Sequence, residues 1–135
     1  MKCEGAMIPK FRAFYKPNKK MYKVLTLDII DKKALIKNTD DLDKPLKGYA
    51  KWEEMELMKS TGLKDKNGKE IFEGDIVKPV SFASWIGVVK YSPENAAYIL
   101  DDHNNEFRRG ENVYLSQFNE VLEVKGNIRE DIEYE

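Results

Sequence analysis

Cysteine and histidine are almost absent from this chain of 135 residues, which has one of each. Because Cys3 is alone, no internal disulfide can form, as is usual in a reducing compartment, and we interpret Cys3 as incidental. A nucleophile activated by histidine would have to use His103, which stands in a polar run typical of a solvated turn. The chain shows no catalytic constellation, and we expect that it is not an enzyme.

Long apolar runs are also missing. No segment approaches the roughly 20 apolar residues of a membrane-spanning helix, and the N-terminal residues lack the apolar core of a signal peptide. A composition of 41% hydrophobic and 35% charged residues nevertheless predicts a folded protein. We therefore expect a cytoplasmic protein that does not bind membranes.

Motifs for metal and phosphate binding are not found. Asp101, Asp102 and His103 have suitable ligand atoms, but adjacent residues rarely converge on one ion. The run from Asp65 to Gly68 lacks the rest of a calcium-loop pattern. Three glycines are spaced six apart, which fits successive turns and not a phosphate loop: Gly62, Gly68 and Gly74. No metal or cofactor is expected.

Short apolar segments separated by turn residues run along the chain. The first part predicts strands at 11–15, 21–30 and 34–36, which would form an antiparallel meander. The next segment, 49–58, is ambiguous. Residues spaced three apart suit a short helix, whereas alternation favours a strand from 54 to 59, which we prefer.

The second part predicts more strands and little helix. Strands are expected at 75–80, 86–91 and 97–101, around Tyr114, and at 120–124, with one helical turn at 115–118. Such regularly spaced short strands suggest a small barrel. Between the two parts, Asn67-Gly68 and Glu73-Gly74-Asp75 predict two turns.

Four segments together resemble the YopX family, which is found in phages and prophages of Gram-positive bacteria. They are TGLKDKNGKEIFEGDIV (61–77), KFRAFYKPNKKMY (10–22), GVVKY (87–91) and EVKGNI (123–128). The family opening usually has Trp and an acidic residue where this chain has Phe14 and Tyr15. The resemblance implies a β-rich fold with an SH3-like barrel in the C-terminal part, a phage accessory role in the bacterial cytoplasm, and no known activity.

The expected organisation is thus mainly β. Residues 1–60 would form an N-terminal β-meander with a connecting segment, and residues 61–135 an SH3-like barrel with an acidic tail, unless both form one compact unit. Charge differs between the halves, since residues 1–48 have twelve Lys/Arg against six Asp/Glu (+6), whereas residues 49–135 have eleven against eighteen (−7). Such halves attract each other within or between chains, or the difference is ordinary variation along a solvated surface.

Two candidate binding surfaces remain. The first is a basic hairpin whose cations alternate with aromatic rings, as single-stranded nucleic acid would require; its cations are Lys10, Arg12, Lys16, Lys19, Lys20 and Lys23. The alternative, which we favour, is an amphipathic hairpin with its rings in the core. The second is a loop with Phe82 and Trp85, which would grip a peptide unless Trp85 belongs to the core.

These observations favour a non-enzymatic phage accessory protein. It would bind an unidentified protein partner or its own copies, as a homo-oligomer. The alternative is a nucleic-acid-binding regulator that uses the basic hairpin.

Overall fold

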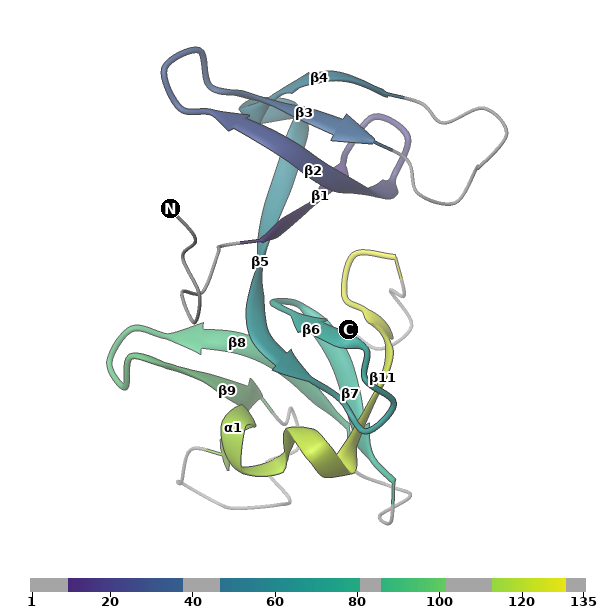
Figure 1. Cartoon of the computed structure of the whole chain (residues 1–135), viewed down its shortest axis with the longest axis vertical. Helices are drawn as coiled ribbons and strands as arrows, with labels where there is room; N and C mark the ends of the chain where they lie inside the picture. Colours follow the sequence, from purple (N-terminus) through teal and green to yellow (C-terminus); the bar gives the residue numbers. More distant parts are fainter. Residues whose placement is uncertain (1–9, 38–46, 81–85, 102–112, 131–135) are drawn as a thin grey trace, which may run out of the picture. The chain divides into compact units, whose positions relative to one another are not determined.

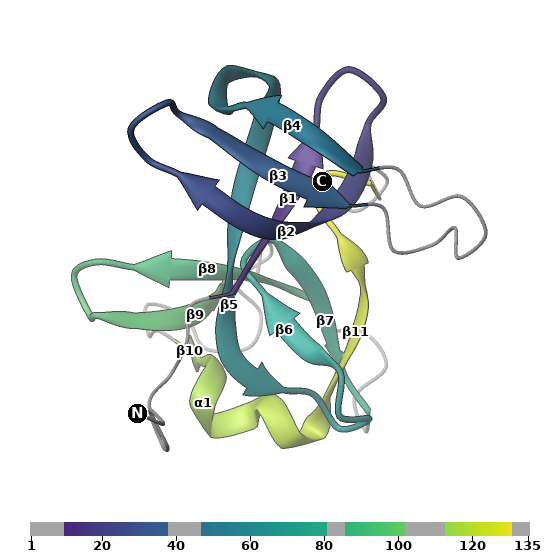
Figure 2. The ribbon, with the colours of Figure 1, turned by 45° about the horizontal axis from the view of Figure 1, so that its top comes forward.

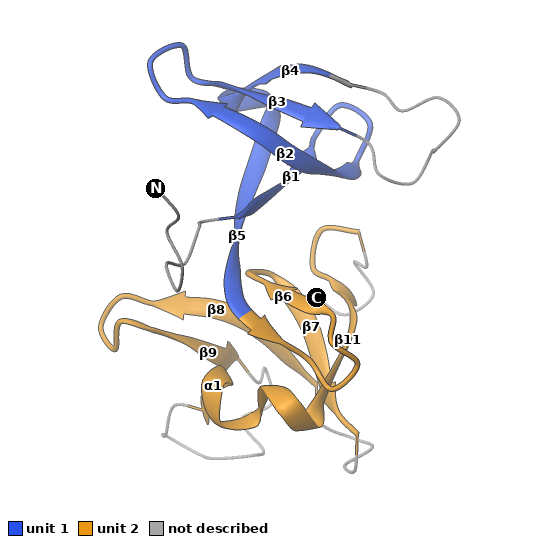
Figure 3. Ribbon diagram, viewed as in Figure 1, with its two compact units in different colours: residues 1–62 blue, residues 63–135 orange. Residues whose placement is uncertain are grey.

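The computed structural model describes residues 10–37, 47–80, 86–101 and 113–130 (Figure 1). These residues form strands, one short α-helix and two 3-10 turns, and the strands pair into two antiparallel sheets. The chain divides into two compact units, residues 1–62 and residues 63–135 (Figure 3). We call them unit 1 and unit 2 and describe each by itself.

Unit 1 is built on a meander of neighbouring strands, which lie side by side in Figures 1 and 2. Its strands are β1 (Phe11–Tyr15), β2 (Lys20–Asp28), β3 (Lys33–Lys37), β4 (Lys47–Lys51) and β5 (Met55–Lys64), with the 3-10 turn η1 (Trp52–Glu54) before β5. The sheet order is β4-β3-β2-β1-β5-β6. Strand β5 runs through the boundary between the units, and β6 (Glu70–Phe72) pairs with it in unit 2.

Alternation along the strands of unit 1 separates two faces. In an antiparallel pair, residues directly opposite each other point to the same face. The register aligns Ala13 with Tyr22 and Ala34 with Ala50, and all four are buried. The core face is therefore formed by three alanines and three larger side chains: Ala13, Tyr22, Ala34, Ile36, Ala50 and Met55.

Unit 2 has a five-stranded sheet in the order β10-β9-β8-β7-β11. The strands are β7 (Asp75–Pro79), β8 (Gly87–Ser92), β9 (Ala97–Asp101), β10 (Val113–Tyr114) and β11 (Leu122–Asn127). Helix α1 (Leu115–Phe118) and the 3-10 turn η2 (Asn119–Val121) connect β10 to β11 (Figure 2). The core of unit 2 consists of aliphatic side chains: Ile71, Val77, Val89, Leu100, Val113, Leu115 and Leu122.

Most sequence-based expectations for the elements agree with the structure. The mainly β class, the strand rather than a helix after residue 54 and the helical turn at 115–118 are confirmed. Strands β4 and β6 were missed, because Lys47-Gly48 and Glu70 do not resemble strand residues.

A small barrel was expected in the second part, and the described residues form no closed barrel. Their five-stranded sheet begins at β10 and ends at β11, and the helical turn, not a strand pairing, joins these two edges. The SH3-like character of this part stays a prediction. Among the described residues, no helix is long and apolar enough to span a membrane.

Candidate functional site

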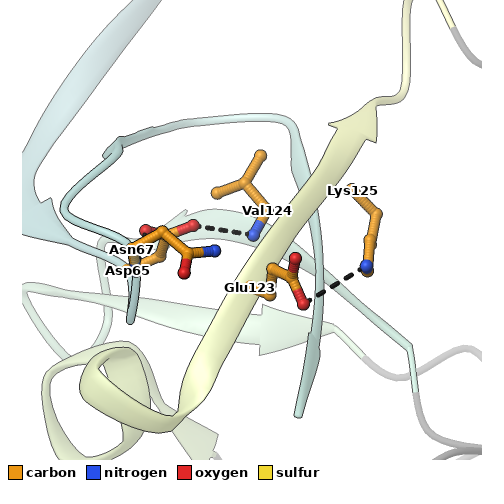
Figure 4. Close-up of polar contacts among 5 residues, drawn as sticks. All are labelled: Asp65, Asn67, Glu123, Val124 and Lys125. Atoms are coloured by element: carbon orange, nitrogen blue, oxygen red, sulfur yellow. Dashed lines mark hydrogen bonds and ion pairs between the residues drawn. The ribbon is translucent and has the colours of Figure 1, made fainter. Parts of the chain in front are cut away.

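Asp65 organises the turn that begins the most distinctive segment of the sequence. Its carboxylate Oδ1 accepts the backbone N–H groups of Asn67 at 2.8 Å and Lys69 at 2.9 Å. Its Oδ2 accepts the N–H of Val124 in β11 at 3.0 Å (Figure 4). One buried side chain thus closes the turn and attaches it to a strand distant in sequence.

These hydrogen bonds also determine the protonation of Asp65. Burial by itself would raise the pKa of the Asp65 carboxyl, but the N–H groups of Val124, Lys69 and Asn67 stabilise the charged form. The net effect is a pKa below the ordinary value. The carboxylate is therefore a structural anion, with three of its acceptor positions used by backbone N–H groups.

The second turn of the segment is equally structural. Gly74 has a φ of 84°, which favours glycine, and it donates its N–H to the Val89 carbonyl at 2.8 Å while its own carbonyl accepts the Ile128 N–H at 2.9 Å. Asp75 accepts the Phe72 N–H through Oδ2 at 2.8 Å. Both turns therefore hold strands of unit 2 together.

Glu73 adds a polar contact from the same turn. The Tyr98 hydroxyl is partly buried, which raises its pKa, and the neighbouring Glu73 carboxylate raises it further by charge and by a hydrogen bond. Every polar contact of this segment described above is made within the protein. Among the described residues, no group of three or more potential metal-ligating side chains is found.

The comparison with known families agrees with this segment and the strands around it. Residues 10–133 match the family model described as YopX protein. The chain belongs to the YopX family. A solved structure with a similar fold is protein EF1440 from Enterococcus faecalis, with a TM-score of 0.60 and 25% sequence identity over 96% of this chain and 99% of that chain. No curated protein matches this chain.

The basic residues of the N-terminal hairpin do not share one surface. In this YopX-family chain, Arg12 and Lys23 are register partners on β1 and β2, on the side opposite the core face, whereas Lys20 is opposite Tyr15 on the core side. Lys16 and Lys19 lie in the exposed turn between the strands, and Lys10 precedes β1.

The aromatic rings of the hairpin are mostly not available to nucleic-acid bases. Phe14 and Tyr22 are 9% and 6% exposed, and Tyr15 stacks edge-on against Tyr22 with 5.9 Å between ring centroids. These rings are packed, as the amphipathic alternative predicted. The hairpin by itself does not present the alternating cations and rings that its sequence suggested.

A different basic surface is formed where β2, β3 and β4 pair. On the side opposite the core face, the register aligns Lys23 with Lys37 and Lys33 with Lys51. Between these two lysine pairs, Leu35 is opposite Tyr49. We call this surface the basic face, and it comprises Lys23, Lys33, Leu35, Lys37, Tyr49 and Lys51.

No ion pair joins any of the four lysines of the basic face to a described residue. One carboxylate, that of Asp28, lies on the same face, as the register partner of Lys33, and it accepts the Asp31 N–H at 2.9 Å. Lys33 instead lies over the Tyr49 ring, with its Nζ 4.7 Å from the centroid.

Tyr49 is 64% exposed, so most of its ring is accessible to a partner. Sequence reasoning singled out Lys23 of this face but none of the other members. The available signal was the charge of residues 1–48, which indicated an excess of cations but not their alignment. The alignment depends on the pairing of β3 with β4, and β4 was not predicted.

Other predicted residues fall outside the described part of the chain. Phe82 and Trp85, the candidate peptide-binding rings, lie there, as do Cys3, Asp102 and His103. The prediction of a peptide-gripping loop therefore stays a prediction.

Proposed function

We propose that this protein is a non-enzymatic binding or self-assembling module that acts through the basic face of unit 1. The observation that carries this proposal is the placement of like charges opposite each other, Lys23 with Lys37 and Lys33 with Lys51. Directly opposed like charges destabilise a sheet by a few tenths of a kcal/mol to about 1 kcal/mol. Such an arrangement is useful to a protein that recruits an anionic partner.

The charge of the two units supports the same proposal. Unit 1 has 14 Lys/Arg against 9 Asp/Glu (+5), and unit 2 has 9 against 15 (−6). A net-positive unit attracts anionic surfaces, including those of another copy of the chain. The family resemblance further supports a phage or prophage accessory role in the bacterial cytoplasm.

Elution from an immobilised polyanion, such as heparin, tests the basic face. The variant K23Q/K37Q/K51Q should elute at lower salt than the unaltered protein, because three cations of the face are removed. The matched control K16Q/K20Q/K59Q removes three exposed cations elsewhere in unit 1. Equal elution of the two triple variants would contradict the role of the face.

Light scattering tests the self-assembling form of the proposal. Association of the unaltered protein should weaken as salt rises, since it would depend on attraction between oppositely charged surfaces. The K23Q/K37Q/K51Q variant should associate less than its matched control. A single 15.7 kDa species at every salt concentration would eliminate self-assembly and leave a separate partner.

A further inference from the structure

We propose that the occupant of the basic face is single-stranded nucleic acid, with its phosphates on the two lysine pairs and an unpaired base stacked on Tyr49. This inference rests on the proposed function and names the partner of the same surface. It differs from the hairpin hypothesis, because most of the residues involved lie on β3 and β4.

The order of side chains across the face carries the first step. Lys33, Leu35 and Lys37 of β3 lie on the same side of the sheet, because every second residue of a strand does. The Cα atom of each lysine is therefore about 7 Å from that of the central leucine. Along β4, Tyr49 lies opposite Leu35, and Lys51 lies opposite Lys33. The centre of the face is thus aromatic and apolar, and lysine pairs flank it on both sides.

The exposure of Tyr49 carries the second step. Aromatic rings on single-strand-binding surfaces stack with bases, while cations beside them contact the backbone. Tyr49 is 64% exposed and has a cation, Lys33, directly over its ring. A duplex would have no unpaired base to place on this ring, so the arrangement favours a single strand.

A second copy of the chain is the competing occupant, since unit 2 is net negative and carries exposed carboxylates at Glu94 and Glu120. Carboxylates supply charge but no flat ring to stack on Tyr49, whereas a single-stranded nucleic acid supplies both regularly spaced anions and unpaired bases.

Fluorescence anisotropy with labelled 20-nucleotide oligo-dT, oligo-rU and a 20-base-pair DNA duplex provides the test, using the full chain. Both single strands should bind more tightly than the duplex. The slope of log K against log salt should be about −3 if four lysines each neutralise one phosphate. K23Q/K37Q/K51Q should make this slope about 2 less steep, and K16Q/K20Q/K59Q should leave it nearly unchanged.

Tyr49 variants separate stacking from charge. Tyr49→Ala should weaken single-strand binding roughly tenfold, whereas Tyr49→Phe, which keeps the ring, should stay within about twofold of the unaltered protein. Neither change should alter the salt slope. Circular dichroism and the melting temperature should show that both variants are folded, since the ring is mostly exposed.

The possible results decide between the inference and the proposed function. No oligonucleotide binding at 50 mM salt, together with heparin retention or self-association that depends on the basic face, would overturn the inference and keep the proposed function. Equal affinity for duplex and single strands, with no effect of Tyr49→Ala, would also overturn it. If oligonucleotide binding, heparin retention and self-association are all independent of the basic face, both the inference and the proposed function are wrong. Different affinities for oligo-dT and oligo-rU would show whether DNA or RNA is the ligand.

Discussion

Unit 1 and unit 2 are both antiparallel β structures, but their cores are built from different side chains. Three of the six buried residues in the unit 1 cluster are alanines: Ala13, Ala34 and Ala50. The unit 2 cluster consists entirely of valine, leucine and isoleucine, all at most 5% exposed. Burial of apolar area provides most of the free energy that stabilises a folded protein. Each core residue of unit 2 therefore contributes more stability on average than each core residue of unit 1.

The exposed charges of the two units also differ. In unit 2, Lys90 pairs with Asp101 across the β8–β9 pair, and Lys125 pairs with Glu123 at 3.2 Å on β11. In unit 1, the register aligns lysine with lysine. Unit 2 therefore places opposite charges together, whereas unit 1 places like charges together at some cost in stability, which is the feature on which the proposed binding role of the basic face depends.

The largest difference is expected in the cores. Ile71→Ala in unit 2 should lower the free energy of unfolding by about 4 kcal/mol, because a fully buried side chain among large neighbours leaves a cavity. Ile36→Ala in unit 1, at a site 7% exposed, should cost only about 2 kcal/mol. Urea unfolding measures both values, and amide hydrogen exchange assigns each loss to a unit.

Ile30→Ala is the control for these two core variants. Ile30 is 91% exposed, so its truncation should change stability by less than about 0.5 kcal/mol. If Ile36→Ala proved as costly as Ile71→Ala, the contrast between the two cores would be lost.

The next largest effect is expected at Asp65. Asp65→Ala removes the acceptor of three backbone N–H groups and should destabilise the protein by about 3 kcal/mol, measured by urea unfolding. Glu94→Ala, which removes an exposed carboxylate in a turn, should have little effect.

The pH dependence of Asp65 follows from its lowered pKa. Its contribution to stability is fully present above the unfolded value of about 3.8 and is lost as the pH falls through the lower folded pKa. Between pH 5 and pH 2, the unaltered protein should therefore lose more stability than Asp65→Ala. Parallel pH profiles would show that Asp65 does not act as a charged acceptor.

A smaller effect is expected at the positive-φ glycines. Gly74→Ala should cost about 1–2 kcal/mol, because its left-handed backbone is unfavourable for a residue with a Cβ. Gly68→Ala, with a φ of 80° and no atom within 4 Å of the added Cβ, measures this backbone cost alone. Gly48→Ala, also with open space but without a positive φ, should be neutral or slightly stabilising. A melting temperature unchanged by Gly74→Ala would show that the turn relaxes.

The smallest effect is the most specific to the comparison, because it changes sign between the units. Lys37→Gln should raise the stability of unit 1 by about 0.5 kcal/mol by relieving repulsion with Lys23. Lys90→Gln should lower that of unit 2 by about 0.5 kcal/mol or less, since its ion pair is largely exposed. Thermal unfolding at low salt checks both, and high salt should reduce both differences. A destabilised Lys37→Gln variant would argue against unrelieved repulsion on the basic face.

Local sequence signals predicted much of the fold. The turns at Asn67-Gly68 and Glu73-Gly74 were predicted correctly, because glycine readily adopts the positive φ that both turns require. Strands β1 and β9 were predicted with the bounds that the structure has, because each is a short apolar-rich run bounded by turn residues. Strand β4 was missed because only its pairing with β3 makes Lys47–Lys51 a strand.

The candidate site was less predictable than the fold. Cations and rings are close in the sequence of the hairpin, which predicted that they share a binding surface. Neighbouring residues of a strand point to opposite faces of the sheet, so closeness in sequence does not bring them together. Lys23 and Lys37 are fourteen positions apart, and only the register makes them neighbours.

By itself, the sequence determined the mainly β class, the turns, the family and the excess of cations in the first part of the chain, because these depend on local propensity and composition. Only the tertiary structure decided which cations face outward together and which rings are buried. The physical reason is that strand register joins residues distant in sequence, and a shift of one residue would move each side chain to the other face.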